Sequence, residues 1–214
     1  MPKPLLYFIL LIFCAPLHAQ KNVDSLKQVI TTTKDPKAKT TAYKAIVSNF
    51  RTKDATQFKK YYAEGITYAR NINDKETELQ LAHNITLNFY YAGNYKAVIQ
   101  RTDSLIPIAK QFETYTIQAD MLNTKGNALS SISNYPQALV IFLEYVEVAK
   151  KIVPKNNRFL ASAHNNIGMA FLNMERYDQA IPYLNKSLAY QELVERNFKA
   201  HTYWNLGICL LYTS

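Results

Sequence analysis

The chain has 214 residues, of which 48% are hydrophobic and 19% are charged, and this ordinary composition excludes a disordered or low-complexity chain. Only 5 glycines and 8 prolines are present, which disfavours a turn-rich β fold and favours long helices. The formal net charge is +9, but the lysines are spread along the chain and do not cluster with aromatic residues. We therefore expect a solvated basic surface and no nucleic-acid partner for this segment.

Residues 1–19 have the layout of a secretory signal peptide. Lys3 supplies the positive start, residues 5–17 are an apolar run, and Ala19 offers a small residue at the cleavage point. The run is too short to span a bilayer, and Cys14 is not preceded by the small residues of a lipoprotein signal. We expect export to the periplasm or cell envelope, with an uncleaved anchor as the alternative.

The rest of the chain divides into a short leading segment and a series of paired apolar segments. Residues 20–36 are amphipathic and are expected to cap the first repeat. Apolar residues then recur at helical spacing, which predicts pairs of helices, and Pro107 is expected to kink its helix or end it early. The array covers 37–214 as about four repeats and a truncated fifth, over 37–75, 79–115, 119–154, 158–195 and 198–214.

A glycine or another small residue recurs in these pairs at a period near forty. Thr86, Gly126, Gly168 and Gly207 are separated by 40, 42 and 39 residues. Repeats of this length are typical of solenoids, whose units bury their apolar faces only by stacking. The sequence therefore predicts an all-α fold, an α-solenoid of antiparallel helix pairs.

The residues at these positions resemble the tetratricopeptide repeat, a helix–turn–helix unit of 34 residues. We call the first and second helices of each repeat A and B. The resemblance implies that small residues let helices A and B approach closely, while aromatic and aliphatic residues fill the gap to the next repeat. The expected packing residues are Gly126, Tyr135, Ala138, Phe142, Gly168, Phe171, Tyr177, Ala180, Leu206 and Gly207.

The same resemblance implies that helix A of each repeat lines a concave groove. The expected groove positions form a strip rich in amides and aromatic rings, which suits a protein or an extended peptide as partner. An alternative is that the asparagines bond only to neighbouring backbone groups. A clamp for a C-terminal carboxylate is not expected, because Lys44 has only Ser48 beside it. The candidate residues are Lys44, His83, Tyr90, Asp120, Asn123, Asn127, Asn165 and Trp204.

No catalytic motif accompanies these features. The sequence contains no HExxH, no CxxC pair, no Walker A loop and no GxSxG. Its histidines are spaced about one per repeat, too far apart for a shared metal. We expect a non-catalytic protein-interaction array without cofactor or metal in this segment.

An exported array with this period is similar to the N-terminal sensor regions of Bacteroidetes histidine kinases and LuxR-type regulators. That similarity implies a downstream transmembrane helix, followed by a kinase or DNA-binding domain. The protein would contact the membrane only through that helix. Residues 209–214 interrupt the fifth helix A and resemble a translated sequencing adaptor, so we expect a truncated fragment. The alternatives are a free-standing periplasmic scaffold and a peptide- or glycan-binding protein.

Overall fold

The computed structural model describes residues 22–194 and 199–213. The expected signal peptide lies outside the described residues. The chain divides into two compact units, Met1–Asn84 and Ile85–Ser214, with the boundary inside one helix. Each unit is described by itself below.

Every regular element in the described residues is an α-helix, which confirms the predicted all-α class. Residues 22–32 are helical and are followed by nine further helices. No helix in this part of the chain is both long and apolar enough to cross a membrane. The nine are α2 (Pro36–Phe50), α3 (Ala55–Asn71), α4 (Lys75–Tyr91), α5 (Tyr95–Gln111), α6 (Tyr115–Ser131), α7 (Tyr135–Ala149), α8 (Asn157–Asn173), α9 (Tyr177–Gln191) and α10 (Lys199–Thr213).

Five of the turns between these helices share one backbone conformation. One residue in each turn has a positive φ, and the chain then enters the next helix within two residues. In the turn before α7, for example, the Asn134 amide donates to the Leu129 carbonyl and the Ser133 amide donates to Ser130. This pattern closes a helix with a left-handed residue. The five residues are Asn73, Gly93, Glu113, Ser133 and Glu175.

These turns correct the predicted start of two helices. Helices were expected from 79 and 119, whereas α4 starts at Lys75 and α6 starts at Tyr115, one turn earlier. The left-handed residues before them are Asn73 and Glu113 instead of glycine, so the turn signal in the sequence is weak there.

Polar side chains fix several of the helix starts. Asp54 accepts hydrogen bonds from the amides of Thr56 and Gln57, and Asp74 accepts from the Thr77 amide. Such caps satisfy amides that have no partner inside the helix. Similar caps are formed by Asp35, Asn94, Asn134 and Asn156.

In the first unit, α2, α3 and the start of α4 pack around a close approach at Gly65. A Cβ at this position would lie 3.1 Å from side-chain atoms of both Tyr43 and Leu81. Ile46 and Val47 of α2 are fully buried. The glycine therefore brings α3 against two helices at once.

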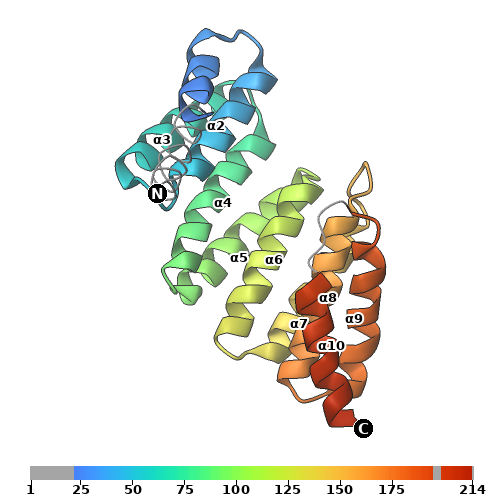
Figure 1. Cartoon of the computed structure of the whole chain (residues 1–214). Coiled ribbons are helices and arrows are strands. Elements are labelled where there is room, and N and C mark those ends of the chain that lie inside the picture. The colour runs from blue at the N-terminus through green and yellow to red at the C-terminus, as the bar shows by residue number, and fades with distance from the viewer. Residues whose placement is uncertain (1–21, 195–198, 214) are drawn as a thin grey trace, which may run out of the picture. The chain divides into compact units, whose positions relative to one another are not determined.

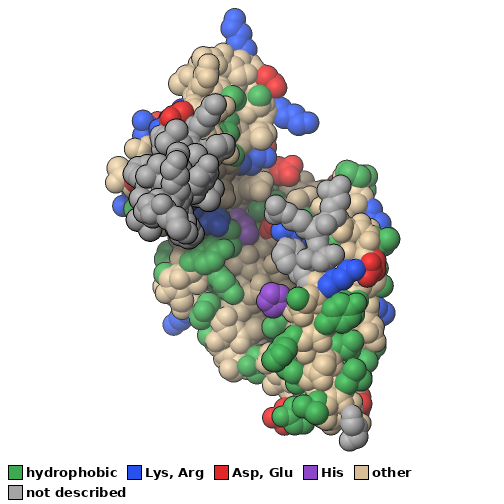
Figure 2. Space-filling model, in the orientation of Figure 1, with side chains coloured by type: hydrophobic (Ala, Val, Ile, Leu, Met, Phe, Trp, Pro, Cys, Tyr) green, Lys and Arg blue, Asp and Glu red, His purple; other side chains and the backbone are tan. Residues whose placement is uncertain are grey.

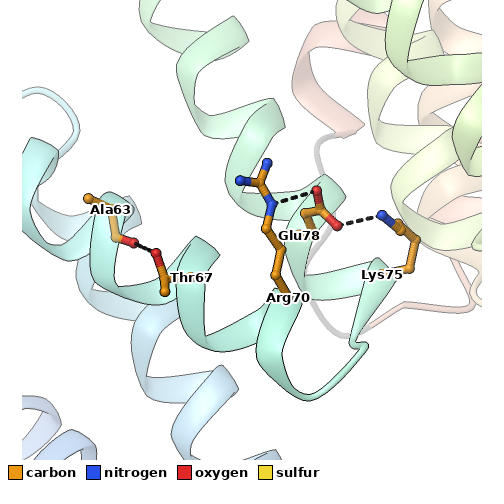
Figure 3. Close-up of polar contacts among 5 residues, drawn as sticks. All are labelled: Ala63, Thr67, Arg70, Lys75 and Glu78. Carbon is orange, nitrogen blue, oxygen red and sulfur yellow. Dashed lines mark hydrogen bonds and ion pairs between the residues drawn. The ribbon is translucent and has the colours of Figure 1, made fainter.

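An ion-pair bridge ties α3 to α4 in the same unit. Glu78 accepts from Arg70 Nε at 3.1 Å and from Lys75 Nζ at 2.5 Å, as Figure 3 shows. Burial alone would raise the pKa of Glu78, but the bonds from Lys75 and Arg70 outweigh it and lower the pKa. The bridge lies at the turn of the helix pair and holds its two helices together.

In the second unit, each helix from α5 to α10 contacts the next one along the chain (Figure 1). The alternate helices α6, α8 and α10 also contact one another in sequence order. Pro107 lies inside α5, which continues to Gln111, so the expected early end of this helix is wrong.

Two glycines of this unit lie at close helix crossings. A Cβ at Gly126 would lie 2.3 Å from the ring of Phe142, and one at Gly168 would lie 2.6 Å from Leu184. Both partners are buried on the following helix, α7 or α9. Only a residue without a side chain allows these approaches.

The other expected packing residues lie around the same crossings. Ala138 is fully buried, Tyr135 is half-buried, and Phe171 stacks on Tyr183 with 5.6 Å between ring centroids. Around α10, a cluster of Ala180, Leu184 and Cys209 is flanked by partly buried Tyr177 and Leu206, among others.

Gly207 is the exception and is a correction to the predicted packing set. It is exposed, and a Cβ added to it would have no neighbouring heavy atom within 4 Å. Within the described residues, no helix reaches Gly207 as α7 reaches Gly126 and α9 reaches Gly168.

Candidate functional site

The candidate site is built on α6, α8 and α10, the first helices of successive pairs in the second unit. Asn123 of α6 accepts a hydrogen bond from Asn166 of α8 at 2.7 Å. Asn127, one turn further along α6, donates to Asn123 at 3.4 Å. Part of the hydrogen-bonding capacity of Asn123 is therefore used between helices, and part of that of Asn127 is used within α6.

A second group of hydrogen bonds joins α8, α9 and α10. Thr202 donates to Asn165 Oδ1 at 3.1 Å and accepts from Gln191 Nε2 at 2.8 Å. Gln191 Nε2 also donates to Ser187 Oγ, which donates to the Ala161 carbonyl at 2.8 Å. The network fixes the end of α9 against both neighbouring helices.

A half-buried carboxyl group, that of Asp120, lies on α6. Burial raises the pKa of Asp120 to about 6, and the Arg158 charge acts in the opposite direction. Burial likewise raises the pKa of Tyr145, while a hydrogen bond with Ser162 opposes that shift. At neutral pH the Asp120 carboxyl group is therefore mostly ionised. The nearby Arg158 charge offsets part of the cost of burying that negative charge.

A cavity of about 290 Å³ opens between α8, the end of α9 and the start of α10. We call it the α8–α10 cavity. Its lining combines an apolar floor with amide, hydroxyl and guanidinium groups. The lining residues are Arg158, Ala161, Ser162, Asn165, Met169, Gln191, Val194, His201 and Thr202.

The aromatic groove candidates have different environments. Trp204 of α10 is 73% exposed, whereas Tyr90 is half-buried and meets Tyr95 edge-on at 5.6 Å between centroids. Hydrophobic side chains gather over α10 in Figure 2, and Tyr203, Leu210, Leu211 and Tyr212 are among the exposed ones. Of these two aromatic candidates, only Trp204 is largely exposed.

The two remaining candidates, Lys44 and His83, belong to the first unit. Lys44 is half-buried on α2. His83 is only 6% exposed, and burial together with the Arg51 charge lowers its pKa to about 4. The expectation that His83 is an exposed groove position is therefore wrong, because its ring lies in the packing of this unit.

A larger and more open hollow of about 640 Å³ lies over α7, α8 and α9. It contains His164, which contacts the Leu160 carbonyl through Nδ1 at 2.8 Å and packs 5.3 Å from the Tyr190 ring. Within the described residues, no group of three or more His, Cys, Asp or Glu could hold a metal ion. The contacts of His164 in this hollow are therefore those of a packed side chain.

Of the cavity lining, only Asn165 was singled out from the sequence. Arg158, Ser162 and Asn165 recur on one face of α8 at helical spacing, and this polar stripe was the available signal. Gln191 gave no such signal, because its role depends on Thr202 of the next helix.

Comparison with known proteins places this arrangement among helical repeats. BtubC (BKLC) from P. vanneervenii has a similar structure, with a TM-score of 0.73 and 14% identity, covering 92% of this chain and 82% of BtubC. The apo form of RapI matches with a TM-score of 0.65 and 18% identity over 81% of this chain and 67% of RapI. These likenesses concern the fold.

A third similar structure is a signal transduction ATPase with numerous domains (STAND) protein with a tetratricopeptide repeat sensor, from Pyrococcus horikoshii. Its TM-score is 0.64 at 15% identity, and the match covers 95% of this chain but 31% of that protein. In sequence, Protein HGV2 of Halocynthia roretzi is 35% identical over 57 residues. That match spans 27% of this chain and only 11% of HGV2.

Residues 159–214 match the family described as tetratricopeptide repeat. The fold thus defines an all-α helical repeat protein. Residues 159–214 are therefore similar in sequence to the tetratricopeptide repeat, and the rest of the chain shares the fold of the similar structures. Repeats of this family generally act as non-catalytic scaffolds that bind proteins or peptides, and solenoids present extended surfaces for that purpose.

Proposed function

We propose that the second unit binds an extended peptide segment of a partner protein along α6, α8 and α10. The α8–α10 cavity is the observation that supports this proposal most strongly. It places amide groups of Asn165 and Gln191 beside an apolar floor, and such pairs of groups recognise a peptide backbone and its side chain together.

Panning a random peptide display library against the purified protein tests this function. We expect enriched peptides to share a short consensus and to bind with micromolar dissociation constants, as measured by calorimetry. Enrichment of no peptide, together with binding on a glycan array, would favour the glycan-binding alternative instead.

The chain is further proposed to be exported, as the sensor ectodomain of a membrane-bound regulator. The layout of residues 1–19 supports export. The STAND protein offers a parallel for the sensor role, since its tetratricopeptide repeats are described as a sensor within a larger signalling protein.

Export and the sensor role are tested separately. Expression in a Gram-negative host should give a periplasmic protein whose mass corresponds to a start at Gln20. An uncleaved product in the cytoplasm would contradict export. Genomic sequence past codon 208 should encode a transmembrane segment and a kinase or helix-turn-helix domain, whereas an early stop codon would favour a free-standing periplasmic scaffold.

A further inference from the structure

The orientation of one buried amide is fixed by its neighbours. Gln191 Nε2 donates to the hydroxyls of Ser187 and Thr202 at 2.9 and 2.8 Å. Each hydroxyl has one proton, which Ser187 donates to the Ala161 carbonyl and Thr202 donates to Asn165 Oδ1. Both hydroxyls can therefore only accept from Gln191. If the amide were flipped, its carbonyl oxygen would face two hydroxyl oxygens that have no proton left to donate.

This orientation leaves the other end of the amide without a donor. Gln191 is 4% exposed, and its Oε1 has no hydrogen-bond partner among the described residues. The residue also lines the α8–α10 cavity. A buried acceptor of this kind is costly to leave unsatisfied, so native structures usually supply a donor from protein, water or ligand.

The rest of the cavity wall restricts what that donor can be. Arg158 is exposed and is the permanently charged residue among the described lining residues. Its charge also acts on the Asp120 carboxyl of α6, but Asp120 does not line the cavity, and no carboxylate stands among the described lining residues. Ala161, Met169 and Val194 give an apolar floor. The volume of about 290 Å³ is far more than one water molecule occupies and lies near the lower end of ligand pockets.

We propose that the α8–α10 cavity is a specificity subsite for an acidic, extended peptide. A backbone N–H of the peptide donates to Gln191 Oε1, an apolar side chain covers Met169 and Val194, and an adjacent Asp or Glu carboxylate lies against Arg158. This subsite rests on the proposed peptide-binding function and adds its sequence preference.

The test uses acetyl-Ala-Leu-Asp-Ala-amide as the probe, with affinities measured by calorimetry. Three analogues each have one backbone nitrogen methylated, and a fourth has Lys in place of Asp. For the wild-type protein, one methylated analogue should bind about 3- to 10-fold more weakly, because it lacks the donated hydrogen bond. The Lys analogue should bind about fivefold more weakly or worse.

Three variants assign these effects to residues. Gln191→Met should abolish the N-methyl effect, and Arg158→Ala should abolish the preference for Asp over Lys. Arg176→Ala is the matched control, because Arg176 is exposed in the turn between α8 and α9, does not line the cavity and should keep both preferences. Circular dichroism checks that each variant is folded. If Gln191→Met is unfolded, the proposal is decided by the Arg158→Ala variant and by the binding of the analogues to the wild-type protein.

The outcomes separate the subsite from the wider function. Library-selected peptides that bind with unchanged affinity to the Arg158 and Gln191 variants would overturn the subsite while peptide binding stands. Equal affinity of all methylated analogues would mean that the cavity holds only water, and this too would overturn it. Failure of the probe and of every library peptide to bind would overturn both proposals.

Discussion

The helices α6 and α10 are the first helices of their pairs, and each has a glycine that the repeat pattern predicts, but their surroundings differ. Gly126 of α6 lies against the Phe142 ring, whereas Gly207 of α10 has open space around it. The repeated glycine therefore indicates a crossing only where a second helix is present to use it. Replacing a glycine by alanine should therefore destabilise the protein in α6 and α8. The same replacement in α10 should stabilise it.

The largest effect is expected at Gly126. A Cβ there would overlap a ring that is 1% exposed and has little room to move. Gly126→Ala should lower the free energy of unfolding by about 3 kcal/mol, the upper part of the range for overpacking. Urea unfolding followed by circular dichroism measures the change. Adding Phe142→Leu should recover part of the loss, and a single variant as stable as wild type would show that the crossing is not tight.

Gly168 should give a smaller effect of the same sign. The contacting atoms belong to the Leu184 side chain, which has more rotamers than an aromatic ring. Gly168→Ala should cost about 2 kcal/mol in the same unfolding assay. A cost larger than that of Gly126→Ala would contradict the argument that side-chain flexibility sets the order.

The half-buried carboxyl group of Asp120 on α6 extends the contrast to pH. The folded pKa of Asp120, about 6, lies above the ordinary value of 3.8, so folding favours the protonated carboxyl. The destabilisation is absent below pH 4, grows between pH 4 and 6, and is complete above that. Asp120→Asn should therefore be more stable than wild type by about 1–2 kcal/mol at pH 7. The two proteins should converge near pH 4; a constant difference across this range would refute the assignment.

The smallest effect, with the opposite sign, is expected at Gly207. Its Cβ would meet nothing within 4 Å, and α10 continues on both sides. Gly207→Ala should stabilise the protein by about 0.5–1 kcal/mol, because alanine restricts the unfolded chain and favours the helix. Thermal unfolding measures the increase. Destabilisation by this change would mean that another helix packs against Gly207 in solution.

The sequence was sufficient for features that depend on local spacing. Small and aromatic residues at a period near forty predicted the helix pairs and the crossings at Gly126 and Gly168. The starts of α4 and α6 were less accessible, because Asn73 and Glu113 occupy left-handed positions where glycine is the usual indicator.

The site was only partly predictable for a related reason. Asn123 and Asn165 were identified from their repeat positions, but the burial of His83 and the bonds of Gln191 arise from contacts between helices. Gln191 meets Ser187 on its own helix and Thr202 on the next, so spacing within one repeat could not indicate its role.

The central claim, that the α8–α10 cavity receives a peptide, is most directly tested by nuclear magnetic resonance. Adding the acidic probe peptide to isotopically labelled protein should shift the side-chain amide signals of Gln191 and Asn165 and the Nε signal of Arg158. Shifts confined to residues of the hollow over α7, α8 and α9, such as Lys186 and Tyr183, would contradict the account, as would no shifts at saturating peptide.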